Sequence, residues 1–345
     1  MRIPNKILIT FNILIFITII SACASEQVAP VNQQNIVWPS SSSLEAKFRF
    51  VRSFSKPIDL GIGRGFWGWL SDVFTGEEKP RLIRPMSVVV TNNNHIYVAD
   101  PGARGVHRFD LDAGNYKLII RADDKALPSP VALALGPDNS VYVVDSELAT
   151  VFQIKNSMEI AQPILTQIKF QQPTGIAYAH DSQRIFVTDT AKHQIRIFNK
   201  DGSDYKSIGR RGSKESEFNF PTYIWLDALG QLYVTDSLNF RVQIFDRDGR
   251  FLKKFGELGD GSGNLSRPKG IAVDKSGHIF VVDALFNAVQ IFNQQGALLL
   301  PIGSRGQNAG EFWLPAGIFI NKDEIFIADS HNQRVQVLRY IGESK

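Results

Sequence analysis

One short phrase, repeated along the chain, constrains the fold more than any other feature of the sequence. In its clearest copy, Pro268 to Asp283, it reads as an apolar strand, a Ser-Gly turn, a second apolar strand and a closing aspartate. Six copies align on the proline and the aspartate: Pro85 to Asp100, Pro130 to Asp145, Pro173 to Asp189, Pro221 to Asp236, Pro268 to Asp283, and Pro315 to Asp329. Successive closing aspartates lie 45, 44, 47, 47 and 46 residues apart. A period of this length that contains only strands and turns predicts an all-β fold, a six-bladed β-propeller with one four-stranded blade per repeat.

A strand near the N-terminus fits a place that the last repeat leaves open. Two more strands follow the closing aspartate, and in the third, fourth and fifth copies a glycine-containing turn joins them, as between Arg241–Asp246 and Arg250–Phe255. The sixth repeat stops after its third strand, Val335–Leu338, while the strand Phe48–Phe54 precedes the first repeat without a partner. We therefore expect residues 47–55 to complete the last blade and close the ring, because closure removes exposed sheet edges.

The repeats resemble the NHL repeat. The residues that carry the resemblance read Pro-x-Gly-Ile-Ala-Val-Asp, then Gly-x-Ile-Phe-Val-Val-Asp, then Asn-x-Arg-Val-Gln-Ile-Phe-Asp, and they recur over about residues 47–340. The match is best in the fourth and sixth copies, which contain Asn239-Phe-Arg241 and Asn332-Gln-Arg334, whereas the first two copies lack the Asn-x-Arg. The resemblance implies a six-bladed propeller, and it leaves the activity open because one scaffold serves many functions.

The N-terminal residues have the pattern of an export signal. Arg2 and Lys6 precede Ile7–Ile20, an apolar run of 14 uncharged residues that is short for a membrane span. Ile20-Ser-Ala-Cys23 follows and resembles the lipobox of bacterial lipoproteins, which implies acylation of Cys23, the single cysteine of the chain. The alternative is an ordinary signal peptide with a chance cysteine. We expect a lipoprotein signal peptide over 1–22, a lipidated Cys23 with a flexible tether over 23–46, and the propeller over 47–345.

These boundaries predict an extracytoplasmic protein held at a membrane by its lipid. Ala24 is not the aspartate that resembles an inner-membrane retention signal, so in a two-membrane bacterium we expect the outer membrane, facing the periplasm. Without residues 1–22 the 38 Lys and Arg become 36 against 34 Asp and Glu, a net charge of +2. That charge is too small to favour nucleic acid as a partner.

The repeated polar residues favour a structural role. A residue that recurs in every blade serves every blade, so we expect the closing aspartates to cap backbone groups and to pair with Arg241 and Arg334. The six histidines show no metal-ligand spacing, and His95, His180 and His278 fall in turns where a solvated histidine is expected. A three-histidine metal site built from different blades remains open.

Departures from the repeat give the candidate binding residues. On the innermost strand of the fourth copy Tyr223 and Trp225 replace glycine or alanine, and they either plug the channel or form one wall of a pocket. An insert over 61–80 contains Phe66, Trp67 and Trp69 on or beside a short amphipathic helical stripe. This insert either caps the propeller or offers an apolar face to a partner or a membrane.

Two functional hypotheses follow. The first is a non-catalytic binding or scaffold lipoprotein that presents loops at one end of the ring to a protein, peptide or glycan of the cell envelope. The second is a metal-dependent extracytoplasmic lyase or hydrolase, similar to peptide-amidating lyases or lactonases of propeller fold. The sequence contains no Gly-x-Ser-x-Gly elbow and no Gly-Lys-Ser/Thr phosphate loop, so we nominate no catalytic residue, metal ligand or cofactor.

Overall fold

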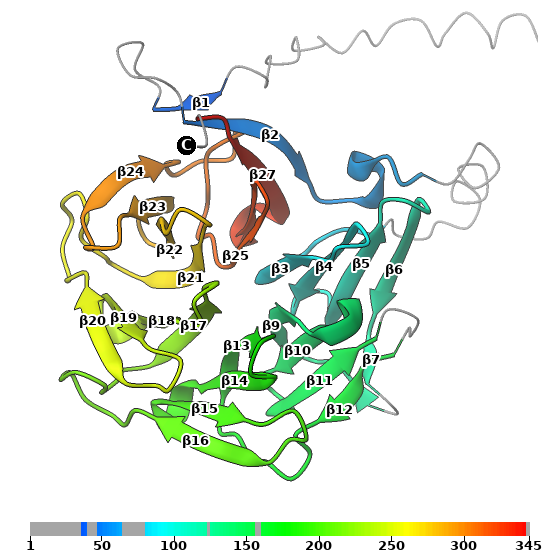
Figure 1. Ribbon diagram of the computed structural model, residues 1–345. Helices are drawn as coiled ribbons and strands as arrows, with labels where there is room; N and C mark the ends of the chain where they lie inside the picture. Colours follow the sequence, from blue (N-terminus) through cyan, green and yellow to red (C-terminus); the bar gives the residue numbers. More distant parts are fainter. Residues whose placement is uncertain (1–35, 40–46, 64–79, 123–124, 156–159, 343–345) are drawn as a thin grey trace, which may run out of the picture. The chain divides into compact units, whose positions relative to one another are not determined.

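Six antiparallel sheets stand around a common axis in the computed structural model, as Figure 1 shows. The structure describes residues 36–39, 47–63, 80–122, 125–155 and 160–342. Residues Gln34–Lys345 form one unit. The innermost strands of the six sheets contact one another in a closed circle, in the order β3, β9, β13, β17, β21 and β25. The predicted six-bladed β-propeller of four-stranded blades is thereby confirmed.

Blades 1 to 5 each consist of four strands that run outward from the axis in sequence order, and blade 6 begins in the same way. Blade 1 has β3 (Ser87–Val90), β4 (His95–Asp100), β5 (Gly105–Asp110) and β6 (Asn115–Ile119), and blade 2 has β9 (Pro130–Leu135), β10 (Val141–Asp145), β11 (Thr150–Ile154) and β12 (Gln162–Ile164). Blade 3 has β13 (Pro173–Ala179), β14 (Arg184–Asp189), β15 (Gln194–Phe198) and β16 (Asp204–Ile208), and blade 4 has β17 (Pro221–Leu226), β18 (Leu232–Asp236), β19 (Arg241–Phe245) and β20 (Phe251–Phe255). Blade 5 has β21 (Pro268–Val273), β22 (Ile279–Asp283), β23 (Ala288–Phe292) and β24 (Leu298–Ile302), and blade 6 begins with β25 (Ile318–Asn321), β26 (Glu324–Asp329) and β27 (Arg334–Tyr340).

Short elements connect or flank the blades. A two-stranded hairpin lies between blades 1 and 2, with strands β7 (Arg121–Ala122) and β8 (Lys125–Ala126). The 3-10 helices of the described residues are η2 (Pro57–Leu60), η3 (Pro137–Asn139), η4 (Thr190–Lys192), η5 (Ser237–Asn239) and η6 (Ser330–Asn332). Within the described ranges, no helix has both the length and the apolar character that crossing a membrane requires.

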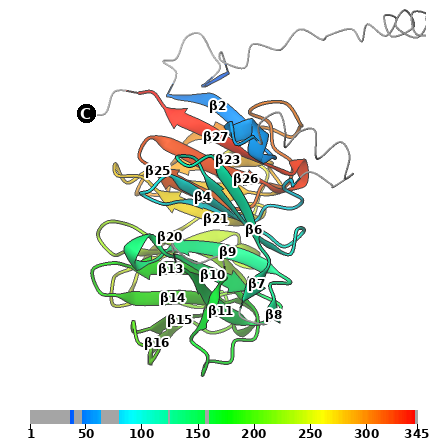
Figure 2. The same ribbon diagram turned by 90° about the vertical axis from the view of Figure 1, so that its right-hand side faces the viewer.

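The ring closes as the sequence predicts. Strand β2 (Phe48–Phe54) pairs antiparallel with β27 and supplies the outer strand of blade 6, and both views show the two strands side by side (Figures 1 and 2). The side chains of Phe48, Phe50 and Phe54 are buried, so β2 contributes packing as well as backbone hydrogen bonds. Strand β1 (Val37–Trp38) pairs with the outer edge of β2 and makes this sheet five-stranded. The sequence does not predict β1, which lies in the segment expected to be a tether.

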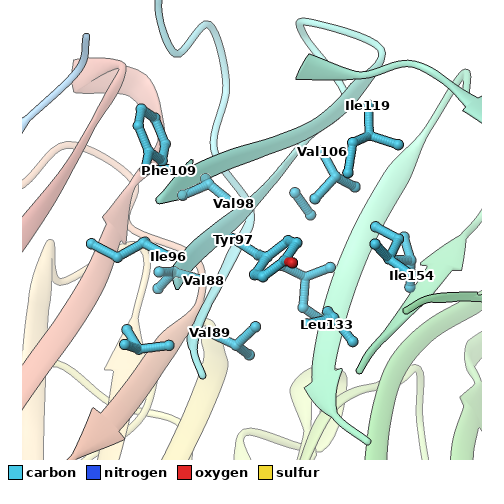
Figure 3. Packing of buried hydrophobic residues seen from close by; sticks show 14 of the residues in the cluster. Val88, Val89, Ile96, Tyr97, Val98, Val106, Phe109, Ile119, Leu133 and Ile154 are labelled. Atoms are coloured by element: carbon cyan, nitrogen blue, oxygen red, sulfur yellow. The ribbon is translucent and has the colours of Figure 1, made fainter. Parts of the chain in front are cut away.

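The hydrophobic core lies between the blades. Strand β4 is buried along its whole length, because one face packs on each neighbouring blade and neither meets water. Figure 3 shows one such layer, in which Tyr97 and Val106 of blade 1 face Leu133 and Ile154 of blade 2. This arrangement explains the weak polar–apolar alternation of the inner strands. It leaves the two ends of the ring and the outer strands of the blades exposed.

Candidate functional site

The two ends of the ring differ in the elements that form them. Register pairs the proline that starts an inner strand with its closing aspartate, as for Pro173 with Asp189, Pro221 with Asp236 and Pro268 with Asp283. We call the end with these pairs and the inter-blade connections the connection end. The opposite end, where each inner strand turns into the next strand, is the hairpin end.

The six closing aspartates have the expected structural role. All six side chains are fully buried, and each carboxylate accepts hydrogen bonds from backbone N–H groups of the connection that leads into its own blade. Asp236 also accepts from Arg241 Nε at 2.8 Å, and Asp329 accepts from Arg334 Nε at 2.8 Å. These carboxylates are engaged within the fold, because each one fixes the start of its blade.

Blade 1 uses a histidine where other blades use glutamine. Gln243 and Gln336 donate from Nε2 to their closing aspartates, at 3.2 and 3.0 Å. In blade 1 the corresponding residue is His107, whose Nε2 lies 3.4 Å from Asp100 Oδ2. Burial acts to raise the pKa of Asp100, but the nearby imidazole of His107 and hydrogen bonds from backbone N–H groups outweigh it and lower that pKa. The histidine is thus part of the blade framework.

A small cavity lies on the axis. Its volume is about 160 Å³, and residues of the inner strands of all six blades line it. The lining reaches the last residues of the inner strands, Leu135 and Leu226, and the exposed His180 just beyond β13, but it excludes the prolines that begin these strands. The cavity therefore lies toward the hairpin end, and His180 stands at its rim.

Tyr223 and Trp225 both line this cavity. The Tyr223 hydroxyl crosses from blade 4 to the opposite blade 1 and donates to the Met86 carbonyl at 2.9 Å. Burial raises the pKa of Tyr223, so the phenol stays neutral. Trp225 packs edge-on against Phe319, with ring centroids 5.9 Å apart. Tyr223 closes the channel toward the connection end, and Trp225 forms a wall of the cavity.

The remaining histidines lie in separate environments. His95, expected in a solvated turn, is buried in β4 with its Nε2 3.1 Å from Asp110 Oδ2, so that expectation is wrong. His193 accepts the backbone N–H of Phe220, and His278 pairs with Asp274. In the ranges that the structure describes, no three His, Cys, Asp or Glu side chains come together as a metal-ligand group.

Four of the candidate residues fall outside the described ranges. These are Cys23 at the predicted lipidation site and the aromatic residues of the insert, Phe66, Trp67 and Trp69. The sequence reasoning missed Tyr178 and His180, which contribute to the cavity beside Ala134 and Ala177. Tyr178 could have been found, because it is aromatic where the other copies have an aliphatic residue at the end of the inner strand.

Comparison with known proteins establishes the class of protein. The family model DUF5128, described as a 6-bladed beta-propeller, matches residues 138–230, 227–285 and 276–341. These spans cover more than half of the chain, and the chain belongs to this family. No curated protein matches the chain.

Solved structures with the same fold have different functions. Virginiamycin B lyase from Staphylococcus aureus is 16% identical, with a TM-score of 0.55 over 75% of this chain and 95% of that one. An auxiliary nutrient binding protein from Bacteroides thetaiotaomicron is 12% identical, with a TM-score of 0.60 over 75% and 70%. A gluconolactonase from Xanthomonas campestris is 14% identical, with a TM-score of 0.58 over 75% and 87%. At these identities the likeness concerns the fold alone.

Proposed function

We propose that the chain is a lipid-anchored, extracytoplasmic propeller of the NHL type that binds a protein, peptide or glycan of the cell envelope without catalysing a reaction on it. The observation that carries this proposal is the axial cavity at the hairpin end. Most of its lining residues are apolar or aromatic, with Ser87 as a polar exception and a single histidine at the rim. Walls of this kind favour an apolar group of a ligand, and the rim supplies a polar contact.

The size of the cavity indicates how much of a ligand enters it. Its volume of about 160 Å³ is close to the roughly 150 Å³ of an engineered cavity that holds benzene. Pockets that enclose a whole small molecule measure about 300–1,000 Å³. The cavity therefore fits one side chain or one ring, and the rest of the ligand lies outside it on the hairpin end. This favours a peptide, protein or glycan partner over a free metabolite.

A substitution that fills the cavity tests this function. Ala134 is buried in the cavity wall, so Ala134→Leu places extra methyl groups in the space that the ligand group would occupy. Ala297, exposed in the turn before β24, gives the matched control Ala297→Leu. N-acetyl amides of Leu, Phe and Trp and methyl glycosides are titrated by calorimetry. We expect saturable binding of at least one probe by wild type and Ala297→Leu, and loss of that binding in Ala134→Leu.

Two results would contradict the proposal. One is the absence of saturable binding with every probe. The other is unchanged affinity in Ala134→Leu, since a ligand group that enters the cavity cannot share its space with the new side chain. Thermal melting of both variants serves as the folding control.

A further inference from the structure

Hydroxyl pairs join neighbouring blades at the connection end. In blade 3 the pair consists of Thr174, the second residue of the inner strand, and Thr190, the residue after the closing aspartate. Their hydroxyl groups are hydrogen-bonded to each other, and the Thr190 hydroxyl also donates to the Pro221 carbonyl of blade 4. In blade 4 the same positions hold Thr222 and Ser237, and Ser237 donates to the Pro268 carbonyl of blade 5 at 2.7 Å. The arrangement is neutral and its hydrogen bonds are satisfied within the fold.

Blade 5 breaks this pattern. Its corresponding residues are Lys269, the second residue of β21, and Ala284, which has no hydroxyl. The Lys269 side chain is partly buried, and it has no hydrogen bond or ion pair within the part of the chain that the structure describes. A lysine thus stands where blades 3 and 4 have threonine, and alanine stands where they have a second hydroxyl residue.

Two arginines add positive charge at the same end. Arg84 and Arg267 each precede the proline that begins an inner strand, and their backbone N–H groups bond the closing aspartates Asp100 and Asp283 at 2.9 and 3.0 Å. Their backbones are therefore fixed, while both side chains are exposed and unpaired among the described residues. By contrast, the guanidinium groups of Arg241 and Arg334 are fully used in ion pairs and carbonyl contacts.

Lys269 is affected by the charges of both arginines, Arg267 from its own blade and Arg84 from blade 1. Blade 6 separates blade 5 from blade 1 along the ring, as Figure 1 shows for β21, β25 and β3. The starts of these inner strands are in contact, because the Gly270 N–H next to Lys269 donates to the Ala316 carbonyl of blade 6 at 2.9 Å, and Gly317 packs against the Met86 carbonyl of blade 1. Lys269 and Arg84 therefore lie on either side of blade 6 at the connection end. Burial, together with the charges of Arg267 and Arg84, lowers the pKa of Lys269 to about 8. Among the described residues, no carboxylate acts to raise this pKa.

We propose that Lys269, Arg84 and Arg267 form a binding site for a phosphate group at the connection end of the channel. A phosphate dianion offsets two of the three charges, the lysine provides a compact point charge, and each arginine fork matches two phosphate oxygens. Tyr223, whose hydroxyl bonds Met86 across the channel, separates this site from the cavity, and none of the three cations lines that cavity. The phosphate site therefore stands independently of the function proposed above.

Phosphate binding to the full chain tests this site. Inorganic phosphate and glycerol 1-phosphate are titrated by calorimetry at pH 7 and low ionic strength, with sodium chloride of matched ionic strength as the reference. We expect saturable binding of phosphate by wild type and a dissociation constant raised about tenfold or more in Lys269→Met, because a charged hydrogen bond is lost. Lys275→Met, an exposed lysine at the hairpin end of the same blade, is the matched control and binds like wild type.

The two ligands distinguish the source of the group. Equal affinities for inorganic phosphate and glycerol 1-phosphate show that the free anion is sufficient. Tighter binding of glycerol 1-phosphate indicates that the natural ligand is a phosphate group on a larger molecule. Either result supports the site if Lys269→Met weakens the binding. The double variant Arg84→Gln, Arg267→Gln changes only exposed side chains and must also weaken binding, which keeps the test decisive if Lys269→Met does not fold. The proposal is overturned if wild type binds phosphate no more tightly than chloride, or if these variants bind phosphate with the same affinity as wild type.

Discussion

Lys269 carries a positive charge in surroundings that disfavour its protonated form. The ammonium group is partly buried, Arg84 and Arg267 are also cationic, and among the described residues no carboxylate acts to raise the pKa of Lys269. Most buried polar groups in this protein are satisfied, as the aspartates and hydroxyl pairs of the connection end illustrate. A residue that breaks this rule lowers stability, which is characteristic of a binding site.

Replacing Lys269 by methionine should therefore stabilise the protein in the absence of any ligand. The sign follows from the pKa, which falls from its usual 10.5 to about 8 on folding. Below pH 8 both folded and unfolded chains carry the charge, so folding bears the full cost of burying it. Between pH 8 and 10.5 the folded chain loses the proton first, and above 10.5 the cost is gone.

We expect Lys269→Met to raise the free energy of unfolding by on the order of 1–2 kcal/mol at pH 7, less than the full shift implies because the ammonium keeps some contact with water. The gain should shrink steadily as the pH rises from 8 toward 10.5. Urea unfolding at several pH values measures it, with Lys275→Met as the control. A gain that does not depend on pH would assign the effect to packing rather than charge.

At the scale of elements, the outer strand β2 determines whether blade 6 is complete. It pairs with β27 from Phe54 with Val335 to Phe48 with Tyr340 and buries three phenylalanine side chains. Replacing one buried phenylalanine by alanine usually costs about 3–5 kcal/mol, and whole domains are stable by only about 5–15 kcal/mol. The added strand β1 pairs through only two residues, and Trp38 packs against Gly310, so its contribution is smaller.

Three nested deletions should separate these contributions. Deleting residues 24–35 should leave the melting temperature nearly unchanged, and deleting 24–46 should lower it slightly because β1 is lost. Deleting 24–55 also removes β2, and should lower the melting temperature by more than about 10 °C, since each kcal/mol is worth about 2–4 °C in a large domain. Melting followed by circular dichroism measures all three. Similar melting temperatures for the second and third deletions would show that β2 does not hold the ring.

The elements that the sequence predicts are those whose signal is local. The proline, the turn glycine and the closing aspartate mark each blade within about fifty residues, and the missing strand of the last repeat points to Phe48–Phe54. Strand β1 could not be predicted, because Val37 and Trp38 show no periodicity and are held by contacts with β2 and with Gly310, far along the chain.

The candidate sites divide in the same way. Tyr223 and Trp225 stand out in the sequence because they interrupt a run of small residues on the inner strands. Lys269 does not, because a lysine after proline resembles an ordinary surface residue. Its burial and its position across blade 6 from Arg84 arise only when ring closure brings these blades together.

At the scale of the whole molecule, the two ends of the ring offer different chemistry. The hairpin end has a cavity with apolar and aromatic walls, and the connection end has three cations without a counterion among the described residues. Tyr223 lies between them and links opposite blades through its bond to Met86. A propeller built this way can engage two different groups, one at each end, which suits a binding module better than a single deep active site.

Attachment to a membrane would decide which partners these ends meet, and it depends on Cys23. Ile20-Ser-Ala-Cys23 resembles a lipobox, and Cys23 is the single cysteine of the sequence; both observations motivate the prediction that this residue is acylated. A single acyl chain binds a membrane only marginally, whereas two or more give stable anchoring.

Cys23→Ser should therefore move the protein from the membrane fraction to the soluble fraction after export, while its melting temperature stays unchanged. Fractionation of cells that express each form, with metabolic labelling by a fatty acid, measures both location and acylation. Ser21→Ala keeps a small residue in the lipobox and should remain in the membrane fraction as the matched control. If Cys23→Ser stays membrane-bound and wild type takes up no label, the apolar run Ile7–Ile20 is the anchor instead.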